Sequence, residues 1–185
     1  MLVEESTGQV RFRDFVQDEV AMRKVFQDFV YNFYRLEQSE FKVSSERLAW
    51  DAAALSEEAR AVLPEMVTDV SLTKAKKKIV IETKFTPRLL QRNWEKDTIR
   101  SGHLYQLFAY LKNLEGLGDA GKQCEGVLLY PTVGRSLDVG YVIQGHPVRV
   151  RTINLDQSWI GFRADLLQVV GLSPKPLNVP NMDAP

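Results

Sequence analysis

Two carboxylates and one lysine near the middle of the chain could together carry out hydrolysis. Asp69 lies in the run 63–72, and Glu82 and Lys84 lie two residues apart in the run 79–85. Both runs are rich in β-branched and apolar residues and a short basic segment joins them, which predicts a hairpin. Alternation along the second strand places Glu82 and Lys84 on one face, and folding of the hairpin can bring Asp69 opposite Glu82.

Two carboxylates held in this way point to a divalent cation. Like charges close together raise the pKa of at least one group, and a cation between them removes the repulsion. Mg²⁺ prefers oxygen ligands and needs only one or two carboxylates besides water and phosphate oxygens. We therefore expect Asp69, Glu82 and the backbone carbonyl of Thr83 to hold Mg²⁺, with Mn²⁺ as a substitute. Lys84 beside the metal could orient or deprotonate a metal-activated water, as in phosphodiester hydrolysis.

A predicted helix over residues 98–114 could support this site. His103, Gln106 and Tyr110 are three and four residues apart and therefore lie on one stripe. Gln106 could also contact a scissile phosphate. The alternative is that the hairpin charges form an ordinary surface ion pair and that His103 and Tyr110 are half-buried packing residues. The apolar setting of the hairpin, followed by this polar stripe, favours the catalytic interpretation.

Basic residues flank the predicted site in the sequence. The chain has 24 basic and 24 acidic residues and no net charge, but residues 74–100 hold nine basic residues against three acidic ones. We expect two groups to contact DNA phosphates, although a run of lysines in a turn is often only a solvated face. The groups are Lys74, Lys76, Lys77 and Lys78 in the hairpin turn, and Arg88, Arg92, Lys96 and Arg100 before the helix.

Hydrophobic spacing predicts the elements that must position these residues. A long amphipathic helix is expected from about Gln17 to Leu36, a strand near Phe41 and Val43, and a short helix or loop over 52–62. Three strands are expected at 126–130, 137–143 and 147–153, and a last helix at 159–170. This order is typical of a mixed α/β domain. The stripe of the first helix comprises Val20, Met22, Val25, Phe26, Phe29, Val30 and Phe33.

Length and composition limit the remaining classes. We expect one domain over 1–172 and a disordered tail over 173–185, which holds four prolines. No run of 18 apolar residues occurs, so no membrane span is predicted. No secretory signal is recognisable, so the cytoplasm is the expected location. The single Cys124 excludes an internal disulfide and a cysteine zinc cluster. The GxxxxGK[ST] phosphate-loop motif does not occur, so we expect no nucleotide to bind this chain.

Taken in series, these motifs resemble a known group of nucleases. Asp69, then Glu82-Thr-Lys84, then Gln106-Leu-Phe-Ala-Tyr110 are similar to the PD-(D/E)XK superfamily, in the branch with a Gln-xxx-Tyr helix motif. More narrowly, the chain resembles McrC, the nuclease subunit of McrBC 5-methylcytosine restriction systems, from about Phe12 to Gly171. The stretches that carry this resemblance are 26–30, 63–72, 79–85, 103–111 and 126–131.

The resemblance implies a restriction-endonuclease-like fold, with a central mixed sheet flanked by helices. It implies Asp69 and Glu82 as metal ligands and Lys84 as the catalytic lysine of a DNA endonuclease. It also implies a McrB-type GTPase partner, which supplies the motor and the reader of the modified base and fits the missing phosphate loop. Because a double-strand break needs two such sites, we expect a homodimer, or two complexes meeting, on DNA.

Two departures from the family pattern leave alternatives open. Relatives often carry a glutamate in the first helix that helps to hold the metal, where this chain has Gln27 followed by Asp28. Relatives also have a McrB-docking region before the nuclease domain, which is either trimmed or absent here. The alternatives are a stand-alone nuclease of the DNA-repair type and a non-catalytic, nuclease-derived DNA-binding or scaffold subunit.

Overall fold

The computed structural model describes residues 19–86, 90–93, 96–116, 123–133 and 136–174. Most of the predicted tail, the first two residues of the predicted first helix, and Arg88 lie outside these residues. In the described part of the chain, no helix is long and apolar enough to cross a bilayer.

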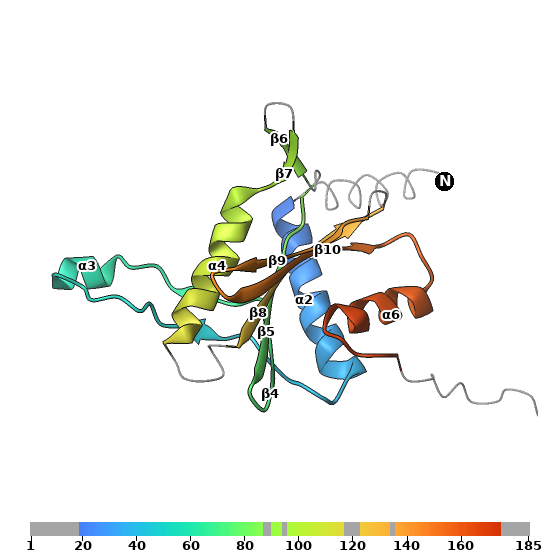
Figure 1. Ribbon diagram of the computed structural model, residues 1–185, viewed down its shortest axis with the longest axis horizontal. Helices are drawn as coiled ribbons and strands as arrows, with labels where there is room; N and C mark the ends of the chain where they lie inside the picture. The colour runs from blue at the N-terminus through green and yellow to red at the C-terminus, as the bar shows by residue number, and fades with distance from the viewer. Residues whose placement is uncertain (1–18, 87–89, 94–95, 117–122, 134–135, 175–185) are drawn as a thin grey trace, which may run out of the picture.

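A six-stranded mixed sheet forms the centre of the fold, as predicted (Figure 1). The strand order is β1-β4-β5-β8-β10-β9. The middle strands β5, β8 and β10 are parallel, and the outer strands pair antiparallel. The bounds are β1 Lys42–Ser44, β4 Val70–Lys74, β5 Lys77–Thr83, β8 Cys124–Thr132, β9 Asp138–Ile143 and β10 His146–Asn154.

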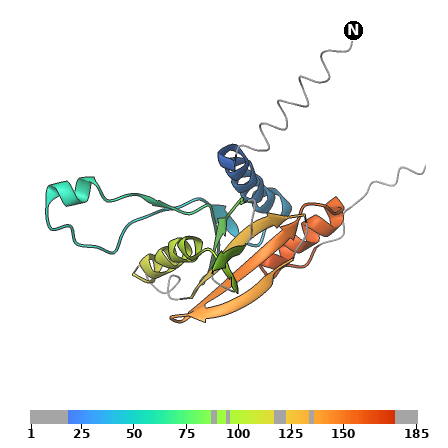
Figure 2. The same cartoon turned by 90° about the horizontal axis from the view of Figure 1, so that it is seen from above.

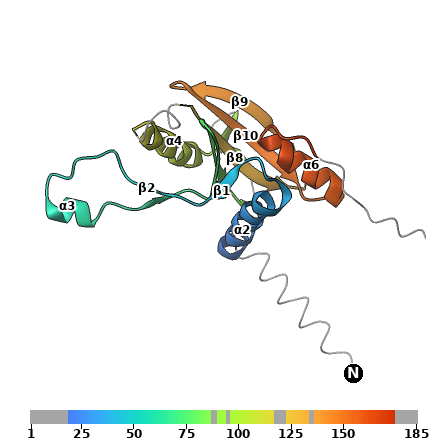
Figure 3. The ribbon, with the colours of Figure 1, turned by 90° about the horizontal axis from the view of Figure 1, so that it is seen from below.

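Helices cover both faces of this sheet. α2 (Glu19–Glu37) and α6 (Trp159–Val169) lie on one face, and α4 (Ser101–Glu115) lies on the other (Figure 3). Two hydrophobic clusters fill the two spaces between helices and sheet. Along β5 the side chains of Ile79 and Ile81 belong to the cluster under α2 and α6, whereas Val80 belongs to the cluster under α4. The predicted alternation along this strand is therefore confirmed.

A long excursion leaves the sheet between β1 and β4. It contains the antiparallel pair of β2 (Arg47–Leu48) and β3 (Met66–Val67) and the fully exposed helix α3 (Glu57–Ala61). Figure 2 shows it projecting away from the rest of the domain. Residues 52–62 were expected to form a short helix or a loop, and the structure has both.

The hairpin that carries the predicted site is shorter than expected on its first side. Residues 63–72 do not form one strand, because the chain changes sheet at Thr68. The Thr68 amide donates to the carbonyl of Glu46, and the Thr68 hydroxyl accepts from the Glu46 amide, which fixes Thr68 to the β2 segment. β4 begins only at Val70, which pairs with Ile81. Asp69 therefore lies one position before the strand, next to Glu82.

The first helix packs over less of its length than its sequence predicts. Phe26, Val30 and Phe33 are buried as expected, but Val20 is 73% and Val25 46% exposed. All fully buried residues of α2 lie from Phe26 onward, so the second half of the helix makes the core contacts. This leaves the first turns of α2 available to line a pocket.

The pair β6 (Leu90–Asn93) and β7 (Lys96–Ile99) was not predicted. Pro87 was expected to end the preceding strand, and residues 86–97 carry a polar, basic sequence without the apolar alternation that marks a strand packed on a core. The two strands form a separate antiparallel sheet. The link from β5 to α4 is therefore an ordered hairpin in its described residues.

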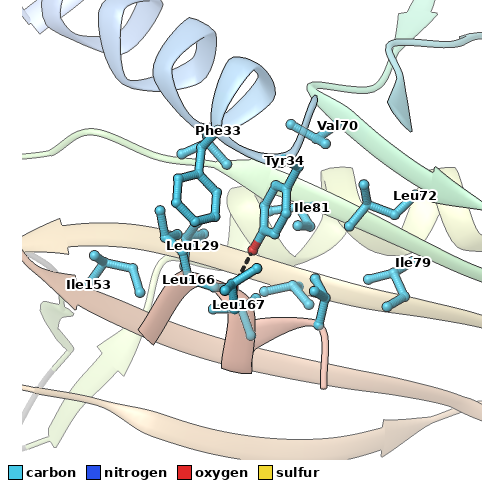
Figure 4. Packing of buried hydrophobic residues seen from close by; sticks show 14 of the residues in the cluster. Phe33, Tyr34, Val70, Leu72, Ile79, Ile81, Leu129, Ile153, Leu166 and Leu167 are labelled. Atoms are coloured by element: carbon cyan, nitrogen blue, oxygen red, sulfur yellow. Dashed lines mark hydrogen bonds between the residues drawn. The ribbon is translucent and has the colours of Figure 1, made fainter. Parts of the chain in front are cut away.

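Tyr34 anchors α6 in the larger core cluster (Figure 4). The last turn of α6 tightens, so that the Val170 amide donates to Leu167 instead of Leu166. The fully buried Tyr34 hydroxyl donates to the carbonyl of Leu166 at 2.8 Å. The hydroxyl thus supplies a partner to a carbonyl at the end of the helix.

Tyr34→Phe is expected to lower the free energy of unfolding by about 2 kcal/mol. The substitution keeps the ring and removes only the hydroxyl, which leaves a buried carbonyl without its partner. Urea unfolding followed by circular dichroism measures the effect. Tyr105→Phe, at an exposed position on α4, is the matched control and should change the free energy of unfolding by less than about 0.5 kcal/mol. Equal stabilities of the two variants would contradict the capping role.

Candidate active site

The predicted catalytic residues meet at the carboxyl end of β5. The register of β4 with β5 places Asp69 beside Glu82, and Lys84 follows directly after the strand. Lys84 continues the parallel pairing with β8, since its amide donates to the carbonyl of Leu129 at 2.9 Å. The first two turns of α4 lie on the same side of the sheet as Glu82, which brings Gln106 to Lys84.

The two carboxylates have different surroundings. One oxygen of Asp69, Oδ2, accepts from the Thr83 amide at 2.8 Å and from the Thr83 hydroxyl at 2.6 Å. Glu82 is 2% exposed, and its Oε1 accepts from Lys84 at 2.7 Å. Its Oε2 is buried and has no hydrogen-bond partner among the described residues. The pKa of Glu82 is raised to about 7, chiefly by burial and also by the charge of Asp69, against the opposing effect of Lys84.

A chain of hydrogen bonds holds the lysine. Lys84 Nζ donates to Glu82 Oε1 and to Gln106 Oε1, each at 2.7 Å. Gln106 Nε2 donates to the Tyr110 hydroxyl at 2.8 Å, which in turn donates to the carbonyl of Val67 at 3.0 Å. The Gln106 side chain is held by Lys84, which donates to its oxygen, and by the Tyr110 hydroxyl, which accepts from its nitrogen. The structure therefore brings Lys84, Gln106 and Tyr110 together as the sequence predicted.

His103 lies on the same stripe but has a different contact. Its Nδ1 is 2.9 Å from the hydroxyl of Tyr130 on β8. The pKa of His103 is lowered to about 4, chiefly by burial and also by the nearby charges of Lys84, Arg100 and Arg23. The imidazole is therefore neutral at physiological pH. Tyr130 was not recognised from the sequence, where it is one residue of an apolar strand.

A pocket of about 550 Å³ adjoins the lysine. Arg23 and Glu19 of α2, which were not predicted as site residues, line it together with Arg100, a residue predicted to bind DNA. The signal for the missed residues was their spacing, since Glu19, Arg23 and Gln27 follow one another at four-residue steps on one helix face. The remaining lining residues are Lys84, Phe85, Thr86, His103 and Gln106.

The predicted supporting residue Gln27 is half-buried one turn beyond Arg23 on α2. Its neighbour Asp28 is exposed and pairs with Lys24 on the surface. Of the two polar residues at this point of the helix, Gln27 is the one on the stripe that leads to the pocket. Its role in holding a metal stays a prediction.

The lysines predicted to bind DNA lie at the other end of the hairpin. Lys77 and Glu82 are five residues apart on an extended strand, which corresponds to roughly 17 Å. Three of the lysines pair with carboxylates: Lys74 with Glu40, Lys77 with Glu125, and Lys78 with Glu46. Arg92 and Lys96 lie on β6 and β7, whose backbone alone is described at these positions. The DNA-binding role of all these residues stays a prediction, and the lysine turn is not next to the candidate site.

The donor set suits a hard cation. The described residues contain no cluster of three or more His, Cys, Asp or Glu side chains that could hold a metal. Two carboxylates are present, and the buried Oε2 of Glu82 lacks a partner. Mg²⁺ keeps several waters and takes only one or two carboxylates, whereas structural zinc needs four nitrogen or sulfur ligands. The residues at the end of β5 therefore suit a hard cation such as Mg²⁺.

The raised pKa of Glu82 predicts how stability of the metal-free protein depends on pH. A carboxyl whose pKa is higher in the folded state stabilises the fold below its unfolded pKa, and this contribution is lost as the pH rises through the folded pKa. The pKa rises from 4.5 to about 7. Between pH 4.5 and 8, the wild type should lose about 3 kcal/mol relative to Glu82→Gln.

Urea unfolding of both proteins in EDTA, at pH values across this range, measures the difference. Glu82→Gln is the control in which the titrating group is absent, so other ionisable groups cancel. Parallel stability curves for the two proteins would contradict the raised pKa.

The chain is similar to known restriction proteins over most of its length. Residues 20–131 match the family model described as "McrBC 5-methylcytosine restriction system component". The chain is 30% identical over 165 residues to the type IV methyl-directed restriction enzyme EcoKMcrBC of Escherichia coli K12. The alignment covers 89% of this chain and 47% of that protein, so the chain spans about half the length of its relative. The segment matched by the family includes Asp69, Glu82, Lys84, Gln106 and Tyr110.

Proposed function

Because the chain belongs to the family of McrBC 5-methylcytosine restriction system components, we propose that it is the part of such a system that cuts DNA. The proposed activity is that of a Mg²⁺-dependent endonuclease with a PD-(D/E)XK fold. The observation that carries the proposal is the meeting of Asp69, Glu82 and Lys84 at the end of β5, where a buried carboxylate oxygen lacks a partner. The mixed sheet with a β4–β5 hairpin and helices on both faces supports the fold assignment.

Asp69 and Glu82 would hold the cation, with the Thr83 carbonyl as a further ligand. When bound, Mg²⁺ or Mn²⁺ would lower the pKa of water and offset charge on the phosphate. Thr83 keeps Asp69 in place through two hydrogen bonds to Oδ2, which leave Oδ1 for the cation. The cation would also relieve the repulsion that contributes to the high pKa of Glu82.

Lys84 is the residue that would act on the substrate. An ammonium has three N–H donors, and two of them are directed to Glu82 and Gln106. The third is left to donate to the attacking water or to a phosphate oxygen. A positive charge held there before the substrate arrives stabilises the negative charge that develops on the phosphate in the transition state. Gln106 and Tyr110 position the lysine, and contact of Gln106 with the scissile phosphate stays a prediction.

The partner and setting follow from the family. EcoKMcrBC is named as a methyl-directed restriction enzyme, and the present chain corresponds to about half of it. The sequence contains no GxxxxGK[ST] motif, the phosphate-binding loop of NTPase motors. We therefore assign the GTPase motor and the recognition of 5-methylcytosine to a McrB-type partner, and cleavage to this chain. Two copies would meet on DNA to cut both strands, in the cytoplasm of a prokaryotic cell.

Plasmid cleavage tests the proposal. The protein is incubated with methylated and unmethylated plasmid in Mg²⁺ or Mn²⁺, with and without a McrB-type GTPase and GTP. Cutting that needs methylation, the partner and GTP supports the proposed function. Cutting without the partner would instead favour a stand-alone nuclease of the repair type. No cutting in any combination would favour a non-catalytic DNA-binding or scaffold subunit.

A further inference from the structure

The pocket beside Lys84 has a strongly cationic lining. Arg23, Lys84 and Arg100 contribute positive charges, and Glu19 is the one acidic residue among the lining residues described. The volume of the pocket, about 550 Å³, lies within the range of sites that hold small molecules or parts of larger ligands. Asp69 and Glu82 do not line it, so the pocket lies beside the carboxylates and shares with them the wall formed by Lys84 and Gln106.

Arg100 lacks a partner for part of its guanidinium group. The residue is half-buried, and its Nε is buried without a hydrogen-bond partner among the described residues. A buried N–H of a charged group that makes no hydrogen bond is costly. An anion in the pocket would supply the missing acceptor. Guanidinium groups suit phosphate in particular, since their planar set of donors can bind two phosphate oxygens at once.

Arg23 has a weak partner that an anion could replace. It pairs with Glu19 at 3.7 Å on the first turns of α2, where both side chains are about half exposed. Exposed ion pairs of this kind contribute little free energy. Arg23 and Glu19 therefore form a pair that a phosphate can open, with Glu19 competing for the same guanidinium.

His103 does not balance these charges. It lines the same pocket as the arginines and Lys84, and all three cations lower its pKa, after the larger effect of burial. A neutral imidazole adds no positive charge and can still make a hydrogen bond through Nε2. With Glu19 as the only counter-charge in the described lining, the three cations leave the pocket positively charged overall.

We infer that this pocket holds a phosphate group of the DNA, next to the phosphate that is cut, with Arg23 and Arg100 as its guanidinium ligands. The inference rests on the proposed function, because it places the bound strand against Lys84. The phosphate belongs either to the continuous backbone or to a 5′ end, and the same two arginines would bind both. Glu19 limits the affinity of the pocket by competing for Arg23.

Measurement of DNA affinity tests the proposed phosphate site without depending on DNA cleavage. Fluorescence anisotropy of a labelled duplex is measured in EDTA from 20 to 200 mM salt, with the duplex carrying either a 5′-hydroxyl or a 5′-phosphate. Arg23→Gln and Arg100→Gln should each weaken binding about ten-fold and reduce the slope of log affinity against log salt by about 0.9. Glu19→Gln should tighten binding about three-fold. Arg35→Gln, at the exposed far end of α2, is the matched control and should bind as the wild type does.

The two duplexes identify the source of the phosphate. Equal losses on both indicate a backbone phosphate, and losses confined to the 5′-phosphorylated duplex indicate an end. Either result supports the phosphate site. Wild-type affinity and salt slope in both arginine variants would overturn it, as would a wild type that binds neither duplex at 20 mM salt. If the plasmid is not cut but the arginine variants bind DNA more weakly, only the nuclease activity is rejected. If the plasmid is cut and both arginine variants bind DNA as the wild type does, only the phosphate site in the pocket is rejected.

Discussion

Lys84→Ala is expected to reduce plasmid cleavage by a factor of about 10²–10⁴, the range seen when one preorganised charged donor is lost from an active site. The ammonium is held at 2.7 Å from both Glu82 and Gln106, so its position is set before substrate binds. Alanine removes the donor that would face the reacting phosphate. The rate is measured as conversion of supercoiled to nicked and linear plasmid at saturating Mg²⁺, with the partner and GTP present.

Lys112→Ala is the matched control for this experiment. Lys112 also lies near the candidate site in sequence, on α4, but its side chain is half-buried and pairs with Glu115 at the other end of the helix. Its cleavage rate should equal that of the wild type. Circular dichroism and thermal unfolding show whether Lys84→Ala is folded. A folded Lys84→Ala protein that cuts at the wild-type rate would remove Lys84 from the mechanism.

Asp69→Asn is expected to abolish cleavage, by about 10³-fold or more, and to remove the stabilisation of the fold by Mg²⁺. Asparagine has nearly the same shape, and its carbonyl oxygen can still accept from the amide and hydroxyl of Thr83. The substitution therefore removes the charge and keeps the local structure. In the wild type, Mg²⁺ at ten times its dissociation constant should add about 1.4 kcal/mol to the free energy of unfolding, and Asp69→Asn should gain little.

Urea unfolding with and without Mg²⁺ measures how much the cation stabilises the fold, and so tests the metal site independently of DNA cleavage. Asp28→Asn is the control, because Asp28 forms an exposed pair with Lys24 on α2 and should respond to Mg²⁺ as the wild type does. Equal stabilisation of Asp69→Asn and wild type by Mg²⁺ would show that the cation binds elsewhere. Loss of stabilisation in both variants would show that Asp28 also contributes to the metal site.

Much of the candidate site could be predicted from the sequence, because it depends on local patterns. Alternation along β5 placed Glu82 and Lys84 on one face, and helical spacing placed Gln106 and Tyr110 on one stripe. The structure joins the two sets through the bond between Lys84 and Gln106. The mixed sheet and its two helical layers also followed from the order of the predicted elements.

The features that were missed depend on contacts between distant parts of the chain. The end of the first hairpin strand is set by Thr68, which bonds to Glu46 more than twenty residues earlier. The role of Arg23 depends on where α2 crosses the sheet, which the sequence does not state. The two turns of α2 before Phe26 also carry apolar residues, and their helical spacing alone would assign these turns to the core. The lysine turn is close to the site in sequence, but a strand of seven residues separates them in space.

The bond between the Lys84 amide and the Leu129 carbonyl has a consequence for protein synthesis. It joins residues on neighbouring parallel strands, with β6, β7 and α4 between them in the chain. The contact between His103 and Tyr130 depends on the same strand. Parallel pairing of this kind forms only after the intervening segment has been made and folded back. A nascent chain that already contains Asp69, Glu82 and Lys84 therefore lacks the contact that fixes the Lys84 backbone until β8 has left the ribosome.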